Sequence, residues 1–169
     1  MKKKDDGILK LGQTGALVGE PVWLYLTSLH GQYVVWSEAD NEEYRQVLEI
    51  SPEKGLPQVF VARFNNPARA EFVRKGLRKY AKIGGDIPEA FREKVVRESV
   101  ATHVLKDWRA IALPDGTTGD YTPEIGDKAF KQDPDFFDAI IGAAMREEFH
   151  RAVGVKADGE LLGESSDGT

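Results

Sequence analysis

The chain contains no cysteine, and this absence excludes disulfide bonds, thiolate metal ligands and cysteine nucleophiles. Its three histidines lie far apart in the sequence. No apolar run approaches the roughly 20 residues that a membrane-spanning helix needs. In the opening MKKKDDG, the lysines are followed by two aspartates and a glycine, whereas the basic start of a secretion signal is followed by an apolar stretch. We therefore expect no membrane contact and a protein that stays in the compartment where it is made.

The composition is that of a folded, well-solvated protein. Apolar residues make up 41% of the 169 residues and charged residues 30%, which is typical of globular proteins and not of disordered chains. The formal net charge of −5 argues against a nucleic-acid footprint over the whole surface, although a local basic patch remains compatible with it. The length suits one ordinary domain or a small domain with an appendage.

The first part of the chain, residues 1–64, is predicted to be β-rich. Residues 21–36 are rich in β-branched and aromatic residues and are interrupted at His30-Gly31-Gln32, which predicts two strands joined by a hairpin. In its first strand, alternation places Leu24 and Leu26 on one face and Trp23 and Tyr25 on the other. Residues 41–50 suit a short helix or a strand. The side chains of residues 58–64 alternate between two faces, as expected of a third strand.

The second part, residues 65–154, is predicted to be helical. Asn66-Pro67 starts a first helix, and Asp86 opens a long one that is expected to run to Trp108. Thr122-Pro123 and Asp133-Pro134 start a short and a long helix, and the long one is expected to stop near Gly154. Residues 155–169 are small, acidic and glycine-rich, and we expect a disordered tail. The predicted class is α+β, with a small N-terminal β-hairpin or sheet followed by a predominantly helical bundle.

No catalytic, cofactor or metal site emerges from the motifs. The glycines of GQTGALVGEP lack the spacing and the Lys-Ser/Thr of a phosphate loop. The acidic loop DGTTGDYTPE lacks the alternating ligands and the spaced glutamate of a calcium loop. No histidine pair has zinc-ligand spacing, and no serine lies in G-x-S-x-G. We therefore predict a protein that is not an enzyme, with no catalytic, cofactor-binding or metal-binding residues and no cofactor.

The helix that starts at Pro67 is basic on one side. Three interpretations of this face stay open: a solvated surface, contact with an acidic protein partner, and salt-sensitive contact with nucleic acid. The acidic total charge disfavours nucleic acid. The residues of this basic face are Arg69, Arg74, Lys75, Arg78 and Lys79.

Beyond single motifs, the order of segments from about residue 58 to 151 resembles the tail assembly chaperones of long-tailed bacteriophages (siphoviruses). The sharpest features are Trp108, the Asp115-Gly116 turn, Tyr121-Thr122-Pro123-Glu124 and the Asp133-Pro134 restart. They lie within the segments FVARFNNP, RAEFVRKGLRKYAK, ESVATHVLKDWRAI, LPDGTTG, DYTPEIGDKAFKQDPDFFDAI and AAMREEFHR.

The resemblance implies a non-enzymatic function in virion morphogenesis. Such chaperones bind the tape-measure protein in the host bacterial cytoplasm, leave as tail-tube subunits polymerise around it, and are absent from the mature virion. The implied partner is the tape-measure protein, with the tail-tube protein as a second candidate and a homo-oligomer as an open alternative. A structural tail or virion component is the main alternative function, followed by a nucleic-acid-binding accessory protein.

Tape-measure chains expose apolar helical stripes, and a helical chaperone can cover them with an apolar surface of its own. We hypothesise that the Asp-Gly loop lets the last helices fold back over the end of the central helix, opening or closing such a surface. The alternative for each residue concerned is ordinary core packing. The residues of the hypothesis are Trp108, Phe136, Phe137, Ile140 and Phe149.

Overall fold

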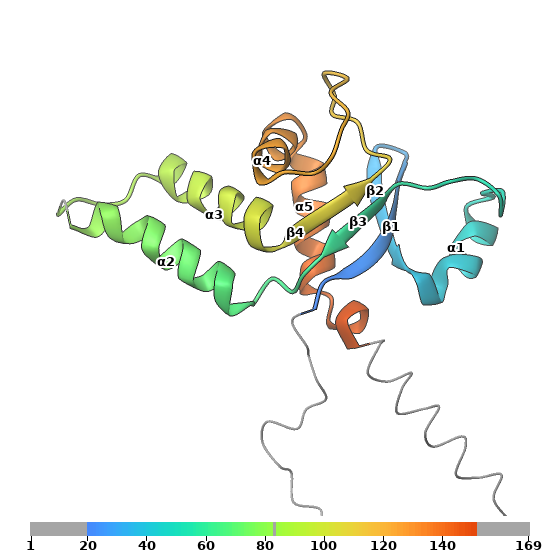
Figure 1. Ribbon diagram of the computed structural model, residues 1–169, viewed down its shortest axis with the longest axis horizontal. Coiled ribbons are helices and arrows are strands. Elements are labelled where there is room, and N and C mark those ends of the chain that lie inside the picture. Colours follow the sequence, from blue (N-terminus) through green and yellow to red (C-terminus); the bar gives the residue numbers. More distant parts are fainter. Residues whose placement is uncertain (1–19, 83, 152–169) are drawn as a thin grey trace, which may run out of the picture.

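The computed structural model describes residues 20–82 and 84–151, which form an antiparallel sheet with helices around it (Figure 1). The strand order in the sheet is β2-β1-β3-β4, so β1 and β3 are central. The predicted α+β class is confirmed. The disordered tail expected at residues 155–169 lies outside the described residues. The strands are β1 (Val22–Leu29), β2 (Gln32–Ser37), β3 (Gln58–Val61) and β4 (Leu105–Arg109).

The hairpin predicted around His30-Gly31-Gln32 joins β1 to β2, with His30 and Gly31 as the turn and Gln32 as the first residue of β2. Both turn residues have positive φ, 50° and 77°, and the flanking pair is Leu29↔Gln32. A two-residue turn with positive φ at both positions matches the right-handed twist of the strands that it connects. The turn fixes the register, which pairs Leu26 with Val35.

Three of the helices start at the capping residues that the sequence predicts. The Asn66 side chain accepts from Arg69 N, Thr122 accepts from Ile125 N, and Asp133 accepts from Phe136 N. In each case a proline follows the cap, where its fixed φ suits the first helical turn. The helices are α1 (Asn41–Val47), which follows the 3₁₀ turn η1 (Glu38–Asp40), then α2 (Pro67–Ala81), α3 (Glu89–His103), α4 (Pro123–Gln132) and α5 (Pro134–Met145).

One face of the sheet carries the core. Leu24 and Val59 are fully buried on β1 and β3, and they contact each other in the antiparallel register. The C-terminal half of α3, together with α4 and α5, supplies the other side of this core, including Ile140, which is also fully buried. On the opposite face Trp23 stacks on Phe60 at a centroid distance of 4.8 Å. The predicted division of β1 into two faces is therefore confirmed.

The expectation that the central helix continues to Trp108 is wrong. The helix α3 ends at His103, and β4 follows it and pairs with β3 through Val59↔Trp108. The edge of β3 offers backbone hydrogen bonds to a partner strand, and Leu105 and Trp108 are buried on β4. Tertiary pairing therefore overrides the helical pattern of this segment.

The long C-terminal helix is shorter than expected. The helix α5 ends at Met145, because Arg146 has an extended backbone (φ −77°, ψ 102°), and Gly154 lies outside the described residues. The break redirects the chain, and Phe149 and His150 are both buried beyond it. Phe149 therefore joins the core from a separate turn.

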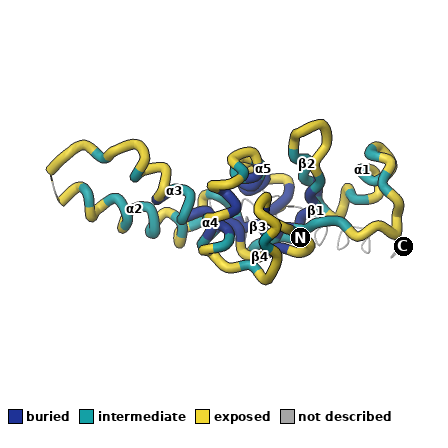
Figure 2. Tube along the Cα trace, turned by 90° about the horizontal axis from the view of Figure 1, so that it is seen from above, coloured by how far each residue is buried: buried dark blue, intermediate teal, exposed yellow. Residues whose placement is uncertain are grey.

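The helices α2 and α3 form a hairpin that projects from the body as an arm (Figure 1). The helices approach closely where Gly76 faces Val95, since a Cβ on Gly76 would lie 2.8 Å from a Val95 methyl group. Tyr80 and Phe91 are in contact further along, with ring centroids 4.2 Å apart. No residue of α2 is fully buried, as the teal and yellow of Figure 2 indicate. The arm therefore leaves much of both helices exposed to solvent.

Candidate functional site

A groove of about 530 Å³ runs between α3 and the junction of α4 and α5. Phe130, which is buried, and Val96 and Phe137, which are partly buried, form an apolar floor. Charged side chains and Pro134 surround this floor, so the groove has an apolar centre and a polar rim. Its lining residues are Glu89, Arg92, Glu93, Val96 and Arg97 of α3, Phe130 and Lys131 of α4, and Pro134 and Phe137 of α5. We call it the α3–α5 groove.

Two contacts fix the shape of the α3–α5 groove. Arg97 Nε donates to Asp127 Oδ1 at 2.7 Å, and both side chains are about four-fifths buried, so this ion pair ties α3 to α4. The rings of Phe130 and Phe137 meet edge to face with centroids 5.0 Å apart, which ties α4 to α5. Aromatic pairs of this geometry contribute about 0.5–1.5 kcal/mol beyond the burial of their area. The groove is therefore held on three rigid elements.

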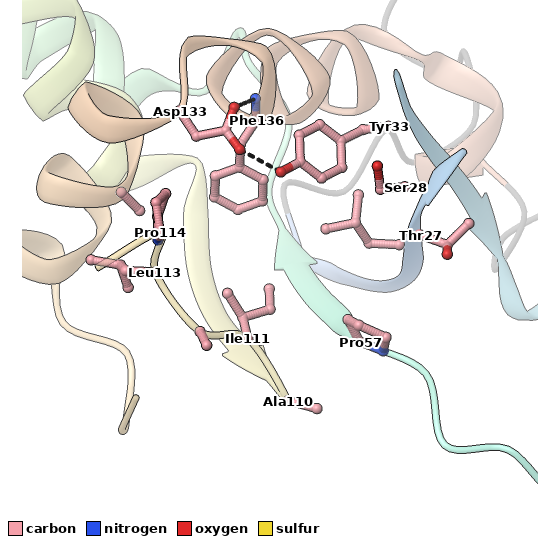
Figure 3. Close-up of a pocket in the computed structure, with 13 residues that line it drawn as sticks. Thr27, Ser28, Tyr33, Pro57, Ala110, Ile111, Leu113, Pro114, Asp133 and Phe136 are labelled. Carbon is pink, nitrogen blue, oxygen red and sulfur yellow. Dashed lines mark hydrogen bonds between the residues drawn. The ribbon is translucent and has the colours of Figure 1, made fainter. Parts of the chain in front are cut away.

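A second hollow, of about 230 Å³, lies where β3 begins (Figure 3). Figure 3 shows Tyr33 and Phe136 on one side of it, with Ile111 and Leu113 from the loop after β4 facing them. The walls are mainly apolar. The full set of lining residues is Leu26, Thr27, Ser28, Tyr33, Pro57, Ala110, Ile111, Ala112, Leu113, Pro114, Ala129, Asp133 and Phe136.

The polar pair of this hollow maintains its shape. Tyr33 Oη donates to Asp133, and the other oxygen of Asp133 accepts from Phe136 N at 3.0 Å as the cap of α5. Burial, followed by the hydrogen bond to Asp133, raises the pKa of Tyr33 to about 12, so the phenol stays protonated near neutral pH. We interpret the pair as a structural link between β2 and α5.

Four of the five residues hypothesised to bind a partner lie in the hydrophobic core. Phe136, Ile140 and Phe149 are at most 4% exposed, and Trp108 is 5% exposed. Of the five, Phe137 alone is only partly buried, and it lines the α3–α5 groove. In this conformation, therefore, Phe137 is the residue of the set that a partner can reach.

Trp108 anchors the loop that follows β4. Its Nε1 donates to the Gly119 carbonyl oxygen at 3.1 Å, and its ring meets that of Tyr121 edge to face at 5.0 Å. The predicted Asp115-Gly116 turn is present, with Gly116 at φ 84° and Asp115 accepting from Thr117 N. Hydrogen bonds hold the pKa of Asp115 well below its usual range, and the one from Lys128 has the largest effect. These contacts connect the loop to β4 at one end and to α4 at the other.

Residues 64–158 match the family described as YdaY prophage protein, over more than half of the 169 residues. The chain belongs to this prophage protein family. It is therefore phage-derived. No curated protein and no solved structure matches the chain.

The part that matches the YdaY family begins just before α2 and includes every lining residue of the α3–α5 groove. It also contains β4, the loop anchored by Trp108 and the whole projecting arm. The strands β1, β2 and β3 precede it. The groove and the arm are therefore features of the part of the chain that defines the family.

The predicted basic face lies on the arm, and four of its five residues are exposed. Arg69 differs, because its guanidinium lies over the Phe64 ring at 3.6 Å and burial lowers its pKa. Glu71 forms ion pairs with Arg74 at 2.5 Å and with Lys75 at 3.6 Å. Within the described residues no ion pair involves Arg78 or Lys79, which are the most available charges of this face.

Sequence reasoning missed most of the α3–α5 groove. Phe130 and Phe137 are seven residues apart, a spacing of two helical turns, but the Asp133-Pro134 break between them concealed their shared surface. Val96 comes from a helix more than thirty residues earlier in the chain. The one available signal was the apolar spacing of Phe130 and Phe137.

Within the described ranges, no group of three or more His, Asp or Glu side chains lies close enough to hold a metal ion. None of the described helices combines the length and apolarity needed to cross a membrane. His150 is buried, and this burial, together with the positive charge of Arg63, lowers its pKa.

Proposed function

We propose that this prophage protein is a tail assembly chaperone that shields the tape-measure protein during tail morphogenesis. It acts in the host cytoplasm by reversible binding, without bond-making chemistry. The observation that carries the proposal is the α3–α5 groove, with its apolar floor and charged rim on the part of the chain that matches the family. The resemblance to tail assembly chaperones over residues 58 to 151 supports the same function.

The groove suits an amphipathic helix as its occupant. Helices are recognised by grooves that receive an apolar stripe on the floor while polar residues meet the rim. Here Val96 and Phe137 would contact the stripe, and Arg92 and Glu93 would face the polar flanks. Because both signs of charge line the rim, the apolar floor supplies the main attraction, and binding stays weak enough for release when the tail tube forms.

The test uses two substitutions that place carboxylates in the groove with little effect on folding. Val96 is partly exposed, and Pro134 is exposed at the first position of α5, where a negative charge favours the helix. We expect Val96→Glu with Pro134→Glu to weaken binding to a tape-measure fragment at least about tenfold, or about 1.4 kcal/mol. Isothermal titration calorimetry measures the affinity, and thermal melting checks the fold.

Met145→Glu and Val47→Glu are matched controls. Both residues are apolar and exposed, at 61% and 73%, and both lie outside the groove. They should bind the fragment as the parent does. Equal weakening in the controls would contradict the groove as the binding site, and a lowered melting temperature in the groove variant alone would indicate ordinary packing.

The alternative function, a structural tail component, predicts the opposite composition for the finished particle. A chaperone leaves before the tail is complete, whereas a structural component stays in fixed stoichiometry. We expect mass spectrometry of purified virions to find the tail-tube protein and not this chain. Stoichiometric recovery of the chain from the particles would overturn the proposal.

A further inference from the structure

The charges of this protein are separated along its length. Six basic residues and one acidic residue lie between positions 67 and 82, on and just after α2, although the whole chain has a net charge of −5. Six acidic residues and two basic ones lie between positions 38 and 54, around η1 and α1. Figure 1 places α2 and α1 at opposite ends of the long axis. The molecule therefore has a basic end and an acidic end.

The basic end is an exposed helix surface on the projecting arm. Arg74 and Arg78 are four residues apart, as are Lys75 and Lys79, so the four charges form two adjacent rows on one side of α2. All four are exposed. Glu71 compensates part of the charge of the first pair, while Arg78 and Lys79 have no ion-pair partner among residues 20–82 and 84–151. A partner with carboxylates would therefore meet charges that are not already neutralised.

The acidic end is concave. A cleft of about 850 Å³ lies beside α1, and Glu38, Glu42 and Glu49 line it. Arg45 also lines the cleft, and its guanidinium is hydrogen-bonded to the backbone of the following loop. Its Nη1 donates to the carbonyl oxygens of Ser51 at 2.7 Å and Lys54 at 3.0 Å. Within the described part of the chain, no ion pair reaches the carboxylates of Glu42 or Glu49. With three carboxylates and one guanidinium among its lining residues, the cleft carries a net negative charge.

We propose that the basic face of α2 docks into the acidic cleft beside α1 of a second copy of this chain. The contact is head to tail, because the two surfaces differ and lie at opposite ends. A projecting helix and an open cleft of opposite charge are complementary in both shape and sign. Contacts of this heterologous kind propagate unless a rotation closes them into a ring. The α3–α5 groove contains none of the docking residues and stays accessible in such an assembly.

A second copy is favoured as the partner because the same chain supplies both surfaces. An interface made of exposed charges is weak and strongly screened by salt. We therefore expect assembly of the full chain at about 0.05 M salt and dissociation near 1 M, where the Debye length is about 3 Å. Sedimentation velocity at several protein concentrations measures both states.

Charge reversal gives a matched pair of variants. Arg78→Glu with Lys79→Glu, and separately Glu42→Lys with Glu49→Lys, should each abolish assembly at low salt. A mixture of the two variants should restore it, since the acidic arm of one then faces the basic cleft of the other, and the basic arm faces the unchanged acidic cleft. Both variants change exposed residues only, and circular dichroism checks that each is folded.

Three results would overturn the proposal. The parent chain could be a monomer at low salt, the Arg78→Glu, Lys79→Glu variant could assemble like the parent, or the mixture could fail to associate. A fluorescent DNA duplex is added in a parallel titration. Salt-sensitive binding of the duplex that is lost in the Arg78→Glu, Lys79→Glu variant, without any self-association, would assign the basic face to nucleic acid instead.

Discussion

At the scale of single residues, glycines at two helical positions have opposite surroundings. A Cβ built on Gly126 of α4 would lie 2.4 Å from the hydroxyl oxygen of Tyr121, whose hydroxyl donates to the Ala101 carbonyl. Gly142 of α5 has open space around the corresponding position. The first glycine therefore permits close packing of Tyr121 beneath α4, and the second has no such function.

We expect Gly126→Ala to destabilise the fold and Gly142→Ala to stabilise it. Forcing a methyl group against the Tyr121 ring should cost about 1–3 kcal/mol. The same substitution at Gly142 should add about 0.5–1 kcal/mol, because alanine loses less backbone freedom than glycine in a helix. Chemical denaturation measures both values. Two variants of equal stability would contradict the packing of Tyr121 against Gly126.

At the scale of the elements, Asn66 joins three of them. Its Oδ1 accepts from Arg69 N at 2.8 Å and caps α2, while its Nδ2 donates to the carbonyl oxygens of Arg63 at 2.7 Å and His103 at 2.9 Å. One side chain therefore links the segment just after β3, the start of α2 and the end of α3. It sets the base from which the arm projects.

Two substitutions separate the functions of Asn66. Asn66→Ala removes the cap and both donated bonds, and we expect a loss of about 2 kcal/mol or more. Asn66→Asp keeps an acceptor for the cap but places a carboxylate beside two carbonyl oxygens. Hydrogen exchange should then show α2 still protected at its first turn and the arm loosened at its base. Full protection throughout in both variants would exclude this linking function.

Elements with local signals could be predicted, and elements that depend on distant partners could not. The hairpin turn needs only His30-Gly31, and α2, α4 and α5 need only a capping residue followed by proline. The strand β4 needs β3, which lies more than forty residues earlier, and its own sequence also suits the end of a helix. The break at Arg146 likewise has no marker such as glycine or proline at that position.

The candidate site was harder to predict than the fold for a related reason. Apolar spacing identifies residues that are removed from water, but the core and a binding groove share that property. Phe136 and Ile140 are in the core and Phe137 is in the groove, although all three are apolar and close in sequence. Only the three-dimensional placement of α3 beside α5 separates the two cases.

At the scale of the whole molecule, the sheet includes strands from both predicted regions, the β-rich residues 1–64 and the helical residues 65–154. The strand β4 comes from the second region and pairs with β3 of the first. Val59 and Val61 of β3 are fully buried, in a cluster that also contains Leu105 and Ile140. The two regions therefore share one core, whatever their separate functions.

We expect the two regions to be unable to fold separately. A fragment of residues 20–64 keeps β1, β2 and β3 but exposes the β3 edge and the apolar face that the helices cover. So short a fragment then buries too little apolar surface to offset the entropy of folding. Far-UV circular dichroism and amide chemical-shift dispersion should show a disordered fragment, whereas residues 20–151 should melt in a single transition. A fragment of residues 20–64 with dispersed amide signals would instead establish the β-rich region as an independent unit, and the pairing of β4 would then be an addition to a sheet that is already stable.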